Sequence, residues 1–229
     1  LVFALSQLLV ILWQFIDSFT VVHMLQTYGL GFREAIMQKG IYDRGASFIQ
    51  IGLIVTTTFS FVLIPLLTDA MSDHNHVLMN RYTNASLKIT LLISVAAGIG
   101  LINILPMMNH VFFKTDQLSF TLSIYMLTVI GVSLIMMDIA LLQVMNQIRP
   151  IFIGVMSGLL FKIIFNVIFI HFMGILGASI STVLSLMIFV TILHYEVVKY
   201  YRFNRMRAFI VKLMSALIIM SVVIQGLRM

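Results

Sequence analysis

Residues 150–172 read PIFIGVMSGLLFKIIFNVIFIHF, an apolar stretch with Lys162 and Asn166 in its second half. An α-helix needs roughly 20 apolar residues to cross the hydrocarbon core of a membrane, whereas a transmembrane β-strand needs about 9–11. The stretch is therefore predicted to be a transmembrane helix. Its polar residues are unusual for a segment that contacts lipid.

Apolar runs of similar length fill most of the chain. They lie at about 1–25, 46–68, 87–105, 118–145, 150–172, 175–199 and 207–227. Of the 229 residues, 61% are hydrophobic and 10% are charged, whereas a soluble domain carries about 25% charged residues. Helices satisfy their own backbone hydrogen bonds in hydrocarbon. The predicted fold is therefore all-α, a polytopic transmembrane bundle of about seven spans.

The connections between the runs are short, so consecutive helices should be antiparallel neighbours. The segment 28–45 contains four glycines and is predicted to be an interfacial turn before the second span. Connections after the second, fourth and sixth runs carry more Lys and Arg than the others, which places them in the cytoplasm. The Leu1 end is then cytoplasmic and the Met229 end lies near the outer face. Because the chain opens inside an apolar run, we expect it to belong to a longer polypeptide.

Composition argues against several functional classes. The chain has no cysteine, and its six histidines show no metal-ligand spacing. The net charge of +6 comes from basic residues in short loops, which favours membrane lipids rather than nucleic acid as the partner. We find no catalytic nucleophile with a base and no phosphate-binding loop. The sequence therefore predicts neither an enzyme nor a cofactor or metal site.

The first run carries a polar stripe. Gln7, Gln14, Asp17 and Ser18 fall within about 80° of one another on a helix. A charge at mid-membrane costs about 2.5–3.5 kcal/mol, and such groups usually face a bundle interior or a wet cavity. Two interpretations remain: Asp17 faces a cavity, which we favour, or it bonds a neighbouring helix.

In the fifth run, Gly154, Gly158, Lys162 and Asn166 recur every four residues. The two glycines predict close helix packing. Lys162 lies too far from the headgroups to reach them easily. We expect it to pair with a carboxylate, such as Asp138 of the fourth run, or with a bound anion.

Asp43 and Arg44 stand at the entrance to the second run. The planar guanidinium of an arginine suits a phosphate group, and Asp43 can orient it or offset its charge. The simpler alternative is an ion pair that anchors the helix end at the interface. Asp17 lies near the same end of the first run, so Arg44 could reach towards it.

Several stretches, taken together, resemble one family. They are Gln14 to Thr20, Ile41-Tyr-Asp-Arg-Gly45, Phe48 to Gly52, Leu63-Ile-Pro65, Asn146 to Pro150, Gly158 to Asn166 and Gly174 to Thr182. They resemble the polysaccharide-biosynthesis branch of the MOP exporter superfamily, most closely the MurJ-type lipid II flippases of Gram-positive bacteria. The Tyr-Asp-Arg sequence is the most specific part.

The resemblance implies a transporter of two six-helix lobes with a cavity between them. Residues 1–200 would form the second lobe and 201–229 one additional helix, with the first lobe missing. The implied cargo is an undecaprenyl-pyrophosphate-linked peptidoglycan precursor, flipped across the bacterial cytoplasmic membrane by alternating access, with a role in cell wall biogenesis and cell shape. Arg44 matches an arginine that the family requires.

The site predicted from residues and resemblance has two parts. Arg44, Asp43, Asp17, Lys162, Gln14 and Asn166 are expected to bind the anionic polyprenyl-pyrophosphate lipid, and Asp17 and Asp138 are candidates for energy coupling. Three alternatives remain open: export of another polyprenyl-linked polysaccharide, cation-coupled multidrug antiport, and a receptor or scaffold that does not transport.

Overall fold

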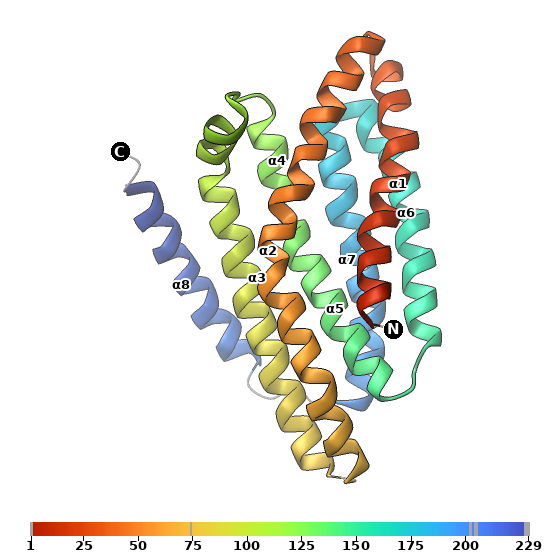
Figure 1. Ribbon diagram of the computed structural model, residues 1–229, viewed down its shortest axis with the longest axis vertical. Helices are drawn as coiled ribbons and strands as arrows, with labels where there is room; N and C mark the ends of the chain where they lie inside the picture. The colour runs from red at the N-terminus through yellow and green to blue at the C-terminus, as the bar shows by residue number, and fades with distance from the viewer. Residues whose placement is uncertain (1, 74, 202, 204–205, 227–229) are drawn as a thin grey trace.

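The computed structural model describes residues 2–73, 75–201, 203 and 206–226, with side chains from residue 11 onward except those at 60, 61 and 207. The described residues form eight α-helices and no strand. The helices are α1 (Val2–Tyr28), α2 (Phe32–Ser72), α3 (His76–Phe113), α4 (Ser119–Tyr125), α5 (Thr128–Val144), α6 (Arg149–Met173), α7 (Ile175–Tyr200) and α8 (Met206–Gly226). Figure 1 shows them alternating in direction, with α4 and α5 following one path.

Six segments of the described chain are long and apolar enough to cross a membrane. They are α2, α3, the α4–α5 pair, α6, α7 and most of α8. The first predicted span falls on α1, whose first side chains lie outside the described residues. Large apolar side chains such as Phe19, Phe152 and Phe172 are exposed on the outer faces of the helices. Exposed apolar side chains are expected where the surrounding solvent is lipid.

The predicted interfacial turn over 28–45 is wrong. The chain turns between Tyr28 and Phe32, at Gly29 with φ +114° and at Gly31, and α2 then continues for 41 residues through Gly40 and Gly45. A glycine inside a helix costs about 1 kcal/mol relative to alanine, which tertiary packing can offset. Gly45 is such a case, because a Cβ there would lie 2.6 Å from the ring of Tyr125.

The predicted run 118–145 forms two helices rather than one. Between α4 and α5 the N–H groups of Met126, Leu127, Val129 and Ile130 bond to carbonyls three residues earlier. This is the tighter 3₁₀ pattern, which in the middle of a helix often marks a hinge or a strained segment. The break turns the Tyr125 ring towards α2, where it stacks on Tyr42 with ring centroids 4.5 Å apart.

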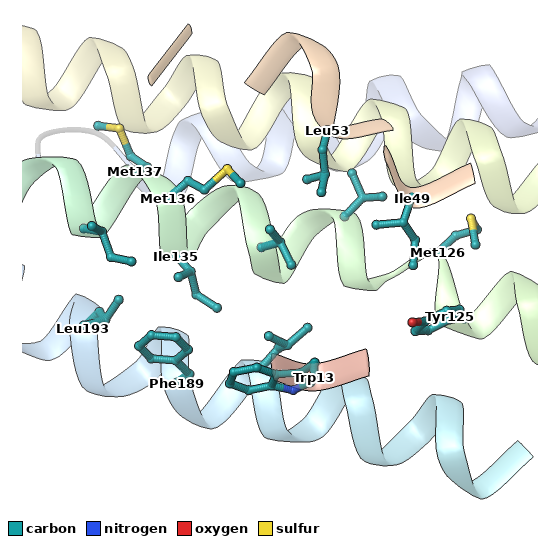
Figure 2. Packing of buried hydrophobic residues seen from close by; sticks show 14 of the residues in the cluster. Trp13, Ile49, Leu53, Tyr125, Met126, Ile135, Met136, Met137, Phe189 and Leu193 are labelled. Carbon is teal, nitrogen blue, oxygen red and sulfur yellow. The ribbon is translucent and has the colours of Figure 1, made fainter. Parts of the chain in front are cut away.

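Helices α6 and α7 form a tight antiparallel pair joined at Gly174. A Cβ at Gly177 would collide with the backbone carbonyl of Phe169, so α7 begins in direct contact with α6. At Gly154 and Gly158 the close contacts are the rings of Phe189 and Trp13 instead of a helix backbone. Figure 2 shows Trp13 beside Phe189 in the core. The two rings stack at 6.0 Å, and α1 is thereby fixed against α6 and α7.

Candidate functional site

Two opposite charges meet inside the bundle. Lys162 of α6 places its Nζ 2.7 Å from Oδ1 of Asp17 on α1, and the two side chains are 0% and 3% exposed. Helices α1 and α6 lie side by side in Figure 1. The prediction that Lys162 pairs with a carboxylate is therefore confirmed, but the partner is Asp17 and not Asp138. Mutual neutralisation makes both charges tolerable at this depth.

Helix α7 completes the surroundings of the ammonium group. Lys162 donates a hydrogen bond to Oγ1 of Thr182 at 2.6 Å and lies 3.5 Å from the carbonyl oxygen of Ala178. Thr182 donates its own hydroxyl hydrogen to that carbonyl, at 2.9 Å. The threonine oxygen can then accept from Lys162 and from the hydroxyl of Tyr42, which lies 3.0 Å away.

The carboxylate of Asp17 is equally well surrounded. Asn166 Nδ2 donates to Asp17 Oδ1 at 2.9 Å and to Thr20 Oγ1 at 2.7 Å. The Tyr42 hydroxyl also lies 3.4 Å from Asp17 Oδ2, so its one proton can go either to this carboxylate or to Thr182. Asp17, Tyr42, Lys162, Asn166 and Thr182 thus form one buried unit, called the Asp17–Lys162 network below. It joins α1, α2, α6 and α7. Polar networks of this kind are stable when their donors and acceptors are paired; in this one Asn166 Oδ1 has no partner among the described residues.

A small cavity adjoins this network between α1, α2, α5 and α7. It has a volume of ≈ 30 Å³ and is lined by Trp13, Gln14, Ala46, Ile49, Tyr125, Thr128, Val132, Ile135, Thr182 and Leu186. Gln14 is half-buried there, and the hydroxyl of Thr128 has no hydrogen-bond partner among the described residues. The volume suffices for water, which needs about 10–15 Å³ and polar partners.

The expectation that Asp17 faces a wet cavity is wrong in this arrangement. Its exposed fraction is 2%, and the contact with Lys162 explains its burial without water. The polar stripe also divides: Ser18 is exposed and bonds to the carbonyl of Gln14. The side chain of Gln7 lies outside the described residues.

Arg44 lies apart from the Asp17–Lys162 network. Its guanidinium sits over the ring of Phe113 on α3, 4.8 Å from the centroid, and it is half-buried. The neighbouring Asp43 is exposed and pairs with Lys39 at 2.5 Å instead of with Arg44. In the part of the chain that the structure describes, no carboxylate forms an ion pair with Arg44.

Asp138 occupies a second polar site, separate from that network. It is fully buried on α5, and its Oδ1 lies 3.4 Å from Nδ1 of His194 on α7. Sequence analysis did not identify His194, Tyr42 or Thr182 as site residues. Tyr42 stands beside Asp43 in the quoted motif, and Thr182 ends the quoted stretch that begins at Gly174. The sequence shows which face of a helix is polar, but not which neighbour it meets.

No family model matches the sequence. Among curated proteins, 219 residues are 26% identical to the uncharacterized membrane protein YabM of Bacillus subtilis strain 168, covering 96% of this chain and 41% of that protein. The chain is also 26% identical, over 143 residues, to the lipid II flippase MurJ of the same organism. This match covers 60% of this chain and 26% of the flippase.

Among solved structures, the fold matches that of a lipid II flippase MurJ in an inward closed conformation. The TM-score is 0.60 at 18% sequence identity, and the match covers 84% of this chain and 46% of that chain. The chain therefore spans less than half the length of the proteins it matches. The match confirms the predicted fold class, an all-α bundle of membrane helices, and the bundle shares its fold with part of that structure.

Proposed function

We propose that the chain is the second lobe of a bacterial membrane transporter that flips polyprenyl-pyrophosphate-linked glycans, with lipid II as the first cargo to test. The observation that supports this most is the shared fold with part of a solved lipid II flippase. In this proposal residues 1–200 form the lobe and 201–229 add one helix. A first lobe supplies the opposite wall of the cavity, and the Leu1 end faces the cytoplasm.

Arg44 is the proposed contact for the pyrophosphate. It lies about three turns inside α2, which begins at Phe32, it is half-exposed, and Phe113 supports the plane of its guanidinium. A guanidinium offers paired donors that match phosphate oxygens. Since Asp43 is paired with Lys39, the charge of Arg44 is not neutralised by its neighbour. Exposed Asp43 and half-buried Gln14 are proposed to contact the sugar part of the headgroup.

The Asp17–Lys162 network is proposed to act in the conformational change. In this structure it ties α1 to α6 and α7, and both charges are sealed. If α1 moves away during alternating access, Lys162 and Asn166 become available to the anionic headgroup, and Asp17 loses its counter-charge. Such rocking of one helical unit against another around a central site is the usual mechanism in transporters built from repeats.

The test uses cells depleted of their own lipid II flippase and supplied with the full-length protein that contains this chain. We expect the wild type to restore lipid II accessibility at the outer face of the membrane. Arg44→Ala should lower it by at least about tenfold, the effect of roughly 1.4 kcal/mol in transition-state binding. Arg33→Ala, which removes an exposed arginine from the same helix, is the matched control. Failure of the inserted wild type to restore accessibility would contradict lipid II as cargo.

Another polyprenyl-linked glycan is a second candidate. The longer of the two sequence matches is to the uncharacterized membrane protein, not to the flippase. The pyrophosphate is common to both cargo classes, so Arg44 keeps its role in either. Accessibility of a different glycan-lipid at the outer face, restored by the wild type and lost in Arg44→Ala, would identify this function.

A further inference from the structure

Asp138 is a buried carboxylate with an incomplete set of partners. It is 0% exposed in the middle of α5, and Oδ2 has no hydrogen-bond partner among the described residues. Oδ1 contacts Nδ1 of His194 at 3.4 Å. An ionised carboxylate that is buried without full pairing is costly, and such a group usually binds a proton or a cation.

No other charged group compensates Asp138 in the described part of the chain. The sequence of α2 has no titratable side chain between Arg44 and Asp69. Titratable side chains on the packed elements include Asp17 on α1, Arg81, Tyr82 and Lys88 on α3, Tyr195, Glu196, Lys199, Tyr200 and Tyr201 on or next to α7, and Lys212 on α8. Asp17 pairs with Lys162, Glu196 pairs with Lys199, and none of these side chains forms a described ion pair with Asp138 or His194.

His194 connects this carboxylate to an open space. Its side chain is 37% exposed and stacks on Phe203, with ring centroids 5.3 Å apart. It lines a groove of ≈ 530 Å³ between α3, α7 and the start of α8, whose other lining residues are mostly apolar. The imidazole therefore has one nitrogen directed at Asp138 while the rest of the ring borders the groove.

We propose that Asp138 and His194 form a proton-binding site that exchanges protons with the groove between α3, α7 and α8. A metal ion is not favoured, because the described residues contain no group of three or more His, Asp or Glu side chains that could coordinate one. A proton needs a single oxygen or nitrogen atom. Imidazole is the side chain whose protonation changes most readily near neutral pH.

The pair has three protonation states with different structural consequences. With one proton shared between Nδ1 and Oδ1, the pair is neutral and α5 stays joined to α7. A second proton, taken up from the groove, leaves a neutral carboxylic acid beside an imidazolium, so the attraction between opposite charges is lost and His194 is held less tightly against α5. Loss of the shared proton leaves an unpaired buried carboxylate. Proton uptake and release would therefore alter the α5–α7 contact.

The test follows both groups directly by nuclear magnetic resonance in lipid nanodiscs, with ¹³C at the Asp carboxyl and His Cε1 positions, between about pH 4 and about pH 9. We expect the signals of Asp138 and His194 to change in the same step, because coupled groups titrate as a pair. Asp138→Asn should shift the His194 midpoint by at least about one pH unit. His194→Gln should remove that step from the Asp138 signal.

His171 is the matched control, since it is a helical and exposed histidine of α6 with no described carboxylate partner. Asp138→Asn should leave its titration unchanged. The proposal is overturned if the wild-type Asp138 signal stays constant while His194 titrates, or if His194 has the same midpoint with and without Asp138. The titration of Asp138 is measured in the wild-type protein, so this first outcome does not depend on whether a variant folds.

Discussion

At the scale of single residues, Lys162 shows how a membrane helix tolerates a charge. It is fully buried, and it is paired with Asp17 and bonded to Thr182. Replacing both charges of a buried pair by apolar groups is often neutral or stabilising, whereas removing one partner leaves the other charge uncompensated. We infer that the pair contributes conformational specificity, because the contact between Asp17 and Lys162 fixes how α1 packs on α6.

Lys162→Met should therefore destabilise the protein by about 3–5 kcal/mol. The double variant Asp17→Asn with Lys162→Met should recover most of that loss, because no charge remains unpaired. Lys212→Met on exposed α8 is the control and should leave the unfolding transition unchanged. Denaturant unfolding in micelles measures all three. A double variant as unstable as Lys162→Met would show that the charge pair is not the cause.

Arg44 allows a second prediction at this scale. Arg44→Lys keeps the positive charge but loses the planar pair of donors and most of the stacking on Phe113. We expect the lysine variant to retain less than about a tenth of the transport of the wild type, in the same accessibility assay. Transport equal to the wild type would mean that a point charge at this position is sufficient.

At the scale of elements, the helices that pack beside a segment decide whether that segment continues as one helix or is interrupted. Helix α2 passes through Gly40 and Gly45, whereas the path of α4 and α5 breaks at Met126 and Leu127 without a glycine or proline at the break. The Tyr42–Tyr125 stack and the tight fit at Gly45 lie beside this break. From the local sequence alone, one would expect α2 to be interrupted at its glycines and the helix to continue through Met126 and Leu127.

The α6–α7 contact gives a prediction for glycine at this scale. Gly177→Ala places a methyl group against the backbone of Phe169, which cannot move aside as a flexible side chain would. We expect a loss of about 1–3 kcal/mol, typical of overpacking. Gly100→Ala in α3 is the matched control, since no atom lies near its Cβ, and it should stabilise by about 0.5–1 kcal/mol. Equal effects of the two variants in denaturant unfolding would contradict the close contact.

At the scale of the whole molecule, α8 stands apart from the other helices. Figure 1 shows it at the edge of the bundle, next to α3. Most of its described side chains are exposed, with Leu213 and Leu217 as buried exceptions, and a hydrogen bond joins Asn103 to Ser221. Neither leucine belongs to the buried hydrophobic cluster formed by the other helices.

Deletion of residues 206–229 should therefore leave α1–α7 folded. Trp13, the single tryptophan of the chain, reports on this because it lies between α1, α6 and α7. We expect its fluorescence spectrum to stay unchanged, while circular dichroism loses the helical signal of α8. Loss of cooperative unfolding in the shortened chain would show that α8 is part of the core.

The sequence by itself determined that the chain is a helical membrane bundle and where most of its helices lie. Runs such as 150–172 are long and apolar, and hydrocarbon leaves helices as the way to pair their backbone groups. It also identified Asp17, Lys162 and Asp138 as unusual charges. These conclusions depend on composition and local periodicity, which a single chain displays directly.

The tertiary structure alone decided which partner each charge has. Lys162 meets Asp17 rather than Asp138, Asp138 meets His194, and Arg44 rests on Phe113. Periodicity gives the face of a helix on which a residue lies, but not the rotation and order of helices around it. Those are set by contacts between segments far apart in the chain, such as Trp13 with Phe189. For that reason Asp17, Lys162 and Asn166 were found one by one in the sequence, while Tyr42 and Thr182 and the network they all form were not.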